Sequence, residues 1–385
     1  MKGIRYISMD SGATGYGRAA LSYLRALHHS GVPVTWAPLV QGNGLGREFG
    51  YEPFTGTCCG AGPLDALCNR ELEFGSVLLH AVPEYVPWCR QQNPGKMLVL
   101  YTTWETDRIP KHWPGLLNQA DLILVPCEWN REVFRACGIT PPIAVVPHMF
   151  DPPRASAPDP SPPFSVADDT FVFYSIGVWN PRKAVELTIR CFLETFTARD
   201  PVALVVKTSR LDHARRLHRW HPLVRWSYRL LRMGMFPRPC PRVVLLTDHL
   251  SEPLMAGLHR RGDAYVSLTH GEGWGLGAFD AAGLGKPVIM TGCSGQLDYL
   301  PPELSYHIPW KETPVIDRIC PDSFSPDQRW ADPDVAAAGA LMRRVFSQRA
   351  EAEERGLRLG EHVRKTFTED VVTRTLLDAL RPALI

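Results

Sequence analysis

The distribution of hydrophobic and polar residues along the chain predicts buried strands that alternate with helices. Short apolar runs, bounded by turn residues, are separated by segments of helix length. Such runs are typical of strands in parallel sheets that helices cover on both faces. The runs are Ile4–Met9, Ser76–His80, Met97–Tyr101, Leu122–Pro126, Thr170–Ile176, Ala203–Lys207, Val243–Thr247, Ala264–Leu268 and Pro287–Thr291. The pattern therefore predicts an α/β protein.

A proline-rich segment divides this pattern into two halves. Residues 151–170 hold six prolines, which cannot continue a helix or a sheet, so we interpret the segment as an interdomain linker. Residues 1–150 and 171–365 then form two Rossmann-like domains, and residues 366–385 form a C-terminal helix. We expect the two domains to face each other across a cleft, with ligands bound at the carboxyl ends of the strands.

Composition narrows the class of protein. The 385 residues include 45% hydrophobic and 21% charged residues, as in folded globular proteins, which argues against disorder or a fibre. A net charge of +2 gives no global attraction to nucleic acid or to membranes. No signal peptide is evident, so we expect a cytoplasmic protein. The ten cysteines form no CxxC pair, and we expect reduced thiols rather than disulfides or a zinc site.

The first glycine cluster, DSGATGYGR at residues 10–18, follows the first predicted strand and precedes a helical pattern. Its glycines, among them Gly15 and Gly17, allow close backbone approach, and a helix N-terminus offers N–H groups to an anion. An ordinary tight turn explains the cluster equally well. It does not match GxGxxG, and no acidic residue stands about twenty positions further on, so a nicotinamide site is disfavoured.

A second glycine cluster, THGEGWGLGAFDAAGLGKPVI at residues 269–289, reads as a strand end, a glycine loop, a helix and a strand. Loop glycines at a helix start expose backbone N–H groups that suit a phosphate or a sugar hydroxyl. Glu272 and Asp280 lie eight positions apart, in the loop and about two turns down the helix, and could face one ligand. From spacing alone, a capping Glu272 and a solvated Asp280 remain an alternative.

This cluster resembles the EX7E motif of retaining glycosyltransferases of the GT-B fold, in particular the family 4 type. Three segments are similar to the acceptor-domain end of that family, namely Thr102–Asp107, Ala120–Asn130 and Val145–His148. Ser175–Lys183 is similar to the first segment of its donor domain. The resemblance covers most of residues 1–300 and a terminal helix, which it implies crosses back to the first domain.

The resemblance implies transfer of a sugar, as by a hexosyltransferase, from a nucleotide-diphosphate sugar to an acceptor hydroxyl with retention. Glu272 then holds the donor sugar ring and orients the leaving diphosphate. Asp280 stands where the family has a second glutamate that binds ribose hydroxyls; its side chain is shorter but still an acceptor. The further donor-side loop residues are Gly273, Trp274, Gly275 and Leu276.

A leaving diphosphate requires positive charge near its oxygens. Arg182 and Lys183 meet this need, with Lys207 at the end of a predicted strand as a further candidate. Family members often have an arginine after the glycine that corresponds to Gly177, but this chain has Val178 there. A solvated helix face is the alternative for each cation.

Thr103, Trp104 and Glu105 follow a predicted strand of the first domain, where the family places acceptor contacts. An indole face suits sugar stacking, and a carboxylate could bind or deprotonate an acceptor hydroxyl. A buried tryptophan with a capping glutamate is the alternative. His80 and His148 also end or follow strands, where a lone histidine is more often a satisfied core or loop residue than a catalyst.

Residues 210–238 have no counterpart in the family and hold eight arginines, interleaved with aromatic residues, with Asp212 as their only acid. Such a stretch can lie on an anionic membrane surface, as a peripheral contact, or bind a phosphorylated acceptor. A solvated insertion is the alternative.

No metal or other cofactor is expected. Asp332 and Asp334 spell a DxD string, but we interpret Asp332 as the N-cap and Pro333 as the first residue of a helix over Val335–Phe346. The resemblance likewise implies a metal-independent enzyme.

The expected partners are a nucleotide-sugar donor and an acceptor that is a glycan, a lipid-linked molecule, a protein or a small molecule; nucleic acid is not expected. Asp280 and Val178 keep open a catalytically silent nucleotide-sugar-binding or scaffold protein of the same fold. A sugar-nucleotide epimerase or a phosphorylase is less favoured, because the pattern around Glu272 is that of transferases.

Overall fold

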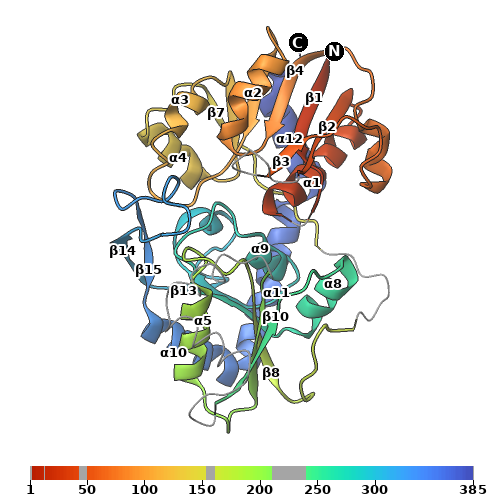
Figure 1. Ribbon diagram of the computed structural model, residues 1–385. Coiled ribbons are helices and arrows are strands. Elements are labelled where there is room, and N and C mark those ends of the chain that lie inside the picture. Colours follow the sequence, from red (N-terminus) through yellow and green to blue (C-terminus); the bar gives the residue numbers. More distant parts are fainter. Residues whose placement is uncertain (1, 13, 43–49, 153–160, 210–239, 385) are drawn as a thin grey trace. The chain divides into compact units, whose positions relative to one another are not determined.

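The computed structural model describes residues 2–12, 14–42, 50–152, 161–209 and 240–384. The chain forms two compact units (Figure 1). Unit 1 comprises Met1–Trp104, Arg108–Asp151 and Phe367–Ile385, and unit 2 comprises Glu105–Asp107 and Pro152–Thr366. The arginine-rich segment 210–238 lies outside the described residues.

Unit 1 is built on a seven-stranded sheet in the order β3-β2-β1-β4-β5-β6-β7, in which β3 is antiparallel to β2 and the other neighbours are parallel. The strands are β1 (Gly3–Met9), β2 (Val34–Gln41), β3 (Tyr51–Pro53), β4 (Phe74–His80), β5 (Met97–Tyr101), β6 (Leu122–Val125) and β7 (Ile143–Val145). The chain reverses its direction of progress across the sheet between β1 and β4. Ligands of open α/β sheets bind at the carboxyl ends of two such strands.

Helices cover this sheet. They are α1 (Gly15–His29), α2 (Val86–Gln92), α3 (Trp113–Leu117), α4 (Glu128–Ala136) and α12 (Glu369–Leu380), with short 3-10 helices η1 (Gly62–Leu67), η2 (Pro83–Tyr85) and η4 (Arg381–Ala383). The C-terminal helix α12 packs on α1, and His29 Nδ1 lies 2.9 Å from Glu369 Oε1. This confirms the prediction that the C-terminal helix returns to the first domain.

Unit 2 is built on a six-stranded sheet in the order β10-β9-β8-β11-β12-β13, in which all neighbours are parallel. The strands are β8 (Phe171–Ile176), β9 (Val202–Lys207), β10 (Arg242–Leu246), β11 (Ala264–Ser267), β12 (Val288–Thr291) and β13 (Tyr306–Ile308). Along the chain this is the 3-2-1-4-5-6 order of the Rossmann fold, and the reversal falls between β8 and β11.

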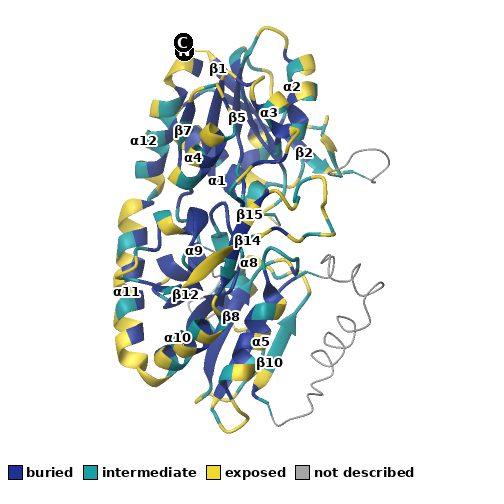
Figure 2. Ribbon diagram, turned by 90° about the vertical axis from the view of Figure 1, so that its left-hand side faces the viewer, coloured by how far each residue is buried: buried dark blue, intermediate teal, exposed yellow. Residues whose placement is uncertain are grey.

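The helices of unit 2 are α5 (Val185–Thr195), α8 (Glu252–Arg261), α9 (Leu276–Gly283), α10 (Val335–Ser347) and α11 (Arg349–Thr366), with a 3-10 helix η3 (Ser294–Asp298). A hairpin of β14 (Trp310–Pro314) and β15 (Arg329–Pro333) separates β13 from α10. Figure 2 shows buried strands beneath helices such as α11 that are exposed on one side. Helix α11 passes close to the turn after α9, where a Cβ at Gly356 would lie 2.6 Å from Gly285 O.

The apolar runs of the sequence coincide with β1, β4, β5, β6, β8, β9, β10, β11 and β12 to within one or two residues. One helix start was predicted wrongly. The N-cap of α10 is Asp334, whose side chain accepts a hydrogen bond from Ala337 N, and not Asp332. Pro333 is the last residue of β15, paired with Trp310, rather than the first residue of the helix. The strand pairing therefore delays the helix by two residues.

All ten cysteines lie within the described ranges, and none of them forms a disulfide there. No helix in the described ranges is both long enough and apolar enough to span a bilayer.

Candidate functional site

The candidate site lies in unit 2, at the carboxyl ends of β8 and β11. The loop after β8 carries Arg182 and Lys183, and the loop after β11 carries Glu272 and continues into α9. Neighbouring parallel strands end at the same edge of a sheet, and here the two strands flank the reversal of strand order. This is the position at which open α/β sheets bind ligands.

Four groups hold the side-chain carboxylate or the backbone of Glu272. Lys183 Nζ donates to both carboxylate oxygens, at 2.7 Å to Oε1 and 2.6 Å to Oε2. Thr269 Oγ1 donates to Oε1 at 3.1 Å, and Arg182 Nη1 donates to Oε2 at 3.2 Å. The backbone N–H of Glu272 donates to Ser294 Oγ at 3.0 Å. The carboxylate, whose side chain is 6% exposed, is therefore fixed in one orientation.

Glu105 extends this cluster to four charged groups. Its Oε1 lies 3.2 Å from Arg182 Nη2, and Arg182 Nη1 also donates to Gly271 O at 2.7 Å. Two cations and two carboxylates alternate in the order Glu105, Arg182, Glu272, Lys183. The cluster is therefore close to electrically neutral when all four groups are ionised.

Burial and charge shift the pKa values of these groups in opposite directions. Burial opposes ionisation of Glu272, but Lys183 and Arg182 outweigh it and hold the pKa of Glu272 below its usual value. Burial raises the pKa of Glu105, and the charge of Arg182 offsets this only in part. Burial also lowers the pKa of Lys183, against the opposing effect of Glu272. Glu272 is thus the more readily ionised of the two carboxyl groups.

Helix α9 begins directly beside Glu272. Its N-cap, Gly275, has a φ of 89°, a left-handed conformation that favours glycine, and a Cβ there would lie 3.4 Å from Glu272 Cγ. Tyr299 Oη donates to Gly275 O at 3.0 Å and fixes the turn. A glycine N-cap offers no side-chain acceptor, so the first N–H groups, those of Leu276 and Gly277, are available to an anion.

Two residues of the same motif have side chains in the core. Trp274 is buried, and its ring packs on those of Phe279 at 5.2 Å and Tyr299 at 5.0 Å. Asp280 is also buried, with Oδ2 3.9 Å from His259 Nε2. The predicted ribose contact of Asp280 therefore lacks an exposed carboxylate in this structure.

The ammonium group of Lys207 bonds to the backbone oxygen of the next residue. Lys207 ends β9, the strand beside β8, and its Nζ donates to Thr208 O at 2.6 Å. Burial lowers the pKa of this lysine.

The residues predicted on the acceptor side, Thr103, Trp104 and Glu105, do not form one binding site, because each has different partners. Thr103 Oγ1 donates to Asn130 Oδ1 at 2.6 Å within unit 1. Trp104 is 4% exposed, and its ring lies 4.7 Å from that of Trp113, so it presents no open face to a sugar. Glu105 belongs to unit 2 instead. Its backbone oxygen would lie 2.3 Å from a Cβ at Gly271, so glycine permits this approach.

The first glycine cluster forms the start of α1, after β1 in unit 1. Thr14 Oγ1 accepts a hydrogen bond from Gly17 N and caps the helix. A Cβ at Gly17 would lie 1.9 Å from Ser11 O, so the turn requires glycine, whereas Gly15 is exposed. This helix start thus has a side-chain cap, in contrast to that of α9.

Both strand-end histidines of unit 1 are satisfied core residues, as the sequence favoured. His80 Nδ1 shares a hydrogen bond of 2.8 Å with Tyr6 Oη. Burial lowers the pKa of His80, and it lowers the pKa of His148 to about 3.

Sequence reasoning missed Thr269 and Ser294 as supports of Glu272. Ser294 stands after β12 with a φ of 56°, in a turn that also presents Gly295 N to Glu272 O at 3.0 Å. Thr269 lies within the recognised motif, but nothing in the sequence indicates that Ser294 contacts Glu272.

The two aspartates of the DxD string have other partners. Asp332 Oδ2 lies 3.6 Å from Lys311 Nζ, and Asp334 caps α10. Within the described ranges, no group of three or more His, Cys, Asp or Glu side chains is arranged to hold a metal ion.

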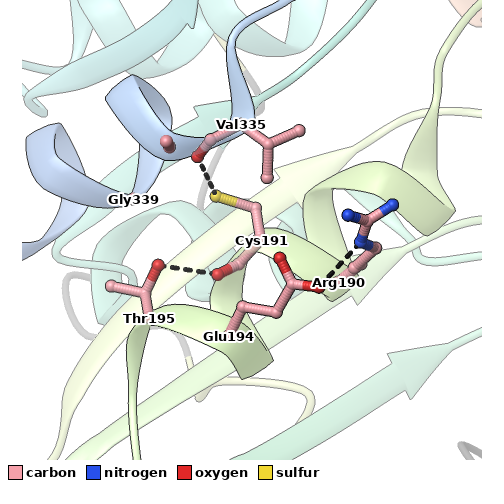
Figure 3. A pocket seen from close by; sticks show the side chains of 7 residues that line it. Arg190, Cys191, Glu194, Thr195, Val335 and Gly339 are labelled. Carbon is pink, nitrogen blue, oxygen red and sulfur yellow. Dashed lines mark hydrogen bonds and ion pairs between the residues drawn. The ribbon is translucent and has the colours of Figure 1, made fainter.

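A separate cavity of about 380 Å³ lies between α5 and α10 (Figure 3). Its polar groups bond to one another: Arg190 Nε to Glu194 Oε1 at 2.8 Å, and Thr195 Oγ1 to Cys191 O at 2.7 Å. None of its lining residues comes from the loops that follow β8 and β11. The cavity is lined by Arg190, Cys191, Glu194, Thr195, Val335, Ala336 and Gly339.

Comparison with known proteins identifies the fold. No protein-family model and no curated protein matches the sequence. Among solved structures, the chain is similar to sucrose-phosphate synthase from Thermosynechococcus elongatus, with a TM-score of 0.67, 14% identity and 99% of each chain covered. It is also similar to Anabaena HepE in complex with UDP and glucose, with a TM-score of 0.65, 12% identity, and 99% of this chain and 100% of that chain covered.

A third similar structure is the pneumococcal O-GlcNAc transferase GtfA in complex with UDP and GlcNAc. Its TM-score is 0.53 at 13% identity, over 80% of this chain and 56% of that chain. The structural neighbours are GT-B glycosyltransferases. The chain therefore has the α/β fold of that class, with two Rossmann-like domains.

Proposed function

We propose that the chain is a retaining glycosyltransferase that moves a hexosyl group from a nucleotide-diphosphate sugar to an acceptor hydroxyl. The observation that carries the proposal is the Glu272–Lys183 ion pair beside the start of α9, at the reversal of strand order between β8 and β11. UDP is present in two of the similar structures, which makes uridine nucleotides the first donors to test.

The donor's diphosphate is bound by Lys183 and by the N–H groups of Leu276 and Gly277. Cleavage of the bond between the sugar and the diphosphate places negative charge on the phosphate oxygens, and fixed positive groups stabilise that charge. Lys183 exchanges Glu272 for the phosphate. The carboxylate of Glu272 is then free to accept hydrogen bonds from hydroxyls of the donor sugar, which orients the anomeric carbon.

We further propose that turnover requires no divalent metal. Lys183 and the helix N-terminus supply positive charge where a metal would otherwise do so. Asp334, the second aspartate of the DxD string, is engaged as a helix cap.

A catalytically silent nucleotide-sugar-binding protein is the second candidate. The buried position of Asp280 favours it, because a ribose would meet no exposed carboxylate at this point of α9. Such a protein would bind the donor without releasing the nucleoside diphosphate.

Thermal unfolding in the presence of UDP and a panel of nucleotide sugars tests both candidates. A ligand at about 100 times its Kd raises the free energy of unfolding by about 2.7 kcal/mol, which produces a measurable shift in Tm. Release of nucleoside diphosphate from the stabilising donor would support the transferase. Stabilisation without release, with every acceptor class supplied, would favour the silent protein, and no stabilisation by any nucleotide sugar would reject both.

A further inference from the structure

Arg182 and Lys183 are adjacent in the sequence but are held in different ways. The Arg182 side chain is 11% exposed and contacts Gly271 O, Glu272 and Glu105. The Lys183 side chain is 22% exposed, and its ammonium group contacts the carboxylate of Glu272. One cation is therefore enclosed by fixed partners, whereas the other has a single exchangeable partner.

We infer that Arg182, anchored by Glu105, is a positioning residue for Glu272, and that Lys183 is the cation of this pair that binds the donor's diphosphate. This inference rests on the function proposed above and assigns separate roles to residues that the sequence had grouped as donor ligands.

The first support is the geometry of the guanidinium group. Its Nη1 donates both to Gly271 O at 2.7 Å and to Glu272 Oε2 at 3.2 Å, and Nη2 pairs with Glu105 Oε1 at 3.2 Å. A planar fork can bridge an oxygen of the loop backbone and two carboxylates, whereas a lysine has a single nitrogen.

The backbone of Arg182 is bonded to the same loop. Arg182 O accepts hydrogen bonds from His270 N at 2.8 Å and from Thr269 Oγ1 at 3.2 Å. Side chain and main chain thus join the loop after β8 to the loop that carries Glu272. Moving Arg182 onto a phosphate would break several of these bonds at once.

The position of Glu105 is itself fixed. Its backbone oxygen packs against Gly271, and two residues further on Asp107 N donates to Arg329 O at 3.1 Å. Glu105 therefore offers Arg182 a carboxylate in a defined place. Between the carboxylates of Glu105 and Glu272, which repel each other, Arg182 acts as the shared counter-ion.

Lys183 has the freedom that a phosphate ligand needs. Its Nζ has three N–H donors, and its two bonds both go to Glu272. The stem passes over Gly177, where a Cβ would lie 3.5 Å from Lys183 Cδ. The ammonium group can turn from Glu272 to an anion without breaking a backbone bond.

Calorimetry with inorganic pyrophosphate and with UDP separates the two roles. The variants are Lys183→Gln, Arg182→Gln, Arg182→Lys and Glu105→Gln. The matched controls are Arg190→Lys and Glu194→Gln, which change an exposed ion pair on α5. We expect Lys183→Gln to weaken binding of both probes at least tenfold. Arg182→Lys and Glu105→Gln should leave both affinities within about twofold of the parent protein while they lower kcat at least tenfold.

Three results would overturn the inference. Weakening of pyrophosphate binding by Arg182→Gln to the same degree as by Lys183→Gln would make Arg182 a direct ligand. Full kcat in Arg182→Lys would show that charge alone suffices. Tighter pyrophosphate binding with unchanged kcat in Glu105→Gln would show that Glu105 only neutralises positive charge and does not anchor Arg182 for catalysis. Where Arg182→Lys fails to fold, judged by its thermal transition, Glu105→Gln supplies the test.

A titration that needs no activity distinguishes failure of the inference from failure of the proposed function. The pKa of Glu272 is followed by carboxyl ¹³C NMR, with its signal assigned through Glu272→Gln. Removal of the Glu105 charge alone would lower the pKa of Glu272, because the two carboxylates repel. Loss of the anchored Arg182 would raise it. A rise in the pKa of Glu272 in Glu105→Gln supports the positioning role of Arg182, and a fall overturns that role. Either result can be read even if the parent protein binds no nucleotide.

Discussion

The substitution Glu272→Gln separates binding of the diphosphate from turnover. It removes one negative charge from a side chain that is 6% exposed, keeps the size of the group, and deprives Lys183 of its ionic partner. Under the proposed function, an incoming diphosphate competes with Glu272 for Lys183 in the parent protein, and this competition is weaker in the variant. We therefore expect the affinity for pyrophosphate to be unchanged or to rise by up to about tenfold, which corresponds to about 1.4 kcal/mol.

Turnover should change in the opposite direction. Hydrogen bonds to charged groups contribute about 1.5–3 kcal/mol. If Glu272 orients the donor sugar as proposed, loss of its carboxylate should therefore lower kcat by about 10- to 150-fold. The free energy of unfolding should fall by about 1–3 kcal/mol, because Lys183 and Arg182 remain partly buried beside a neutral group.

The assay combines calorimetry with pyrophosphate, release of nucleoside diphosphate from the active donor, and thermal unfolding. Glu194→Gln, which removes a carboxylate from the exposed pair on α5, is the matched control and should change none of the three. A tenfold loss of pyrophosphate affinity in Glu272→Gln would refute the competition between Glu272 and phosphate. Parent-like kcat would remove Glu272 from the reaction.

Gly275→Ala should lower the free energy of unfolding by about 1–2 kcal/mol in denaturant titrations, because alanine is strained at a φ of 89°. Ala184→Gly should raise the free energy of unfolding by up to about 1 kcal/mol, because Ala184 has a φ of 47°. A lower free energy of unfolding in this variant would show that the backbone of Ala184 is not strained. Addition of EDTA to an assay with metal-free donor should leave the rate nearly unchanged, and activity that returns only with magnesium or manganese would reject metal independence. His148 has a pKa of about 3 in the folded protein and of 6.5 when unperturbed. As the pH falls below 6.5, the unfolded chain therefore binds a proton at this residue that the folded protein does not bind. The parent protein should then lose about 2 kcal/mol from this group between neutral pH and pH 5, and His148→Gln should show a smaller loss in Tm.

Strand positions were predictable because parallel strands are buried on both faces and therefore appear as continuous apolar runs. The strands that were missed lack this signal. Val34–Gln41 is interrupted by Pro38, although it forms the eight-residue strand β2. The strands β7 and β13 have three residues each, too few to stand out from a loop.

The candidate site was predictable only in part. The glycine loop around Glu272 and the cation Lys183 are visible as motifs, but their contact joins positions 89 residues apart and follows from the strand order. The ion pair of Glu105 with Arg182 likewise depends on the tertiary structure. Residues Glu105–Asp107 belong to unit 2, although the chain on either side of them belongs to unit 1. The motif pattern also could not show that Trp104 and Trp274 turn their indoles inward, where a large apolar ring loses most of its contact with water.

A comparison of the two glycine-rich helix starts supports the proposal that the anion binds in unit 2. Both α1 and α9 begin near the carboxyl end of a strand at the reversal of strand order, the place where a helix N-terminus attracts negative charge. In α1 the Thr14 side chain accepts the hydrogen bond of Gly17 N, so part of that attraction is already satisfied. In α9 the N-cap is Gly275, which has no side chain, and the cation Lys183 is bound to Glu272 close by. The proposed diphosphate site rests on this combination of an exchangeable cation and a helix start without a side-chain cap.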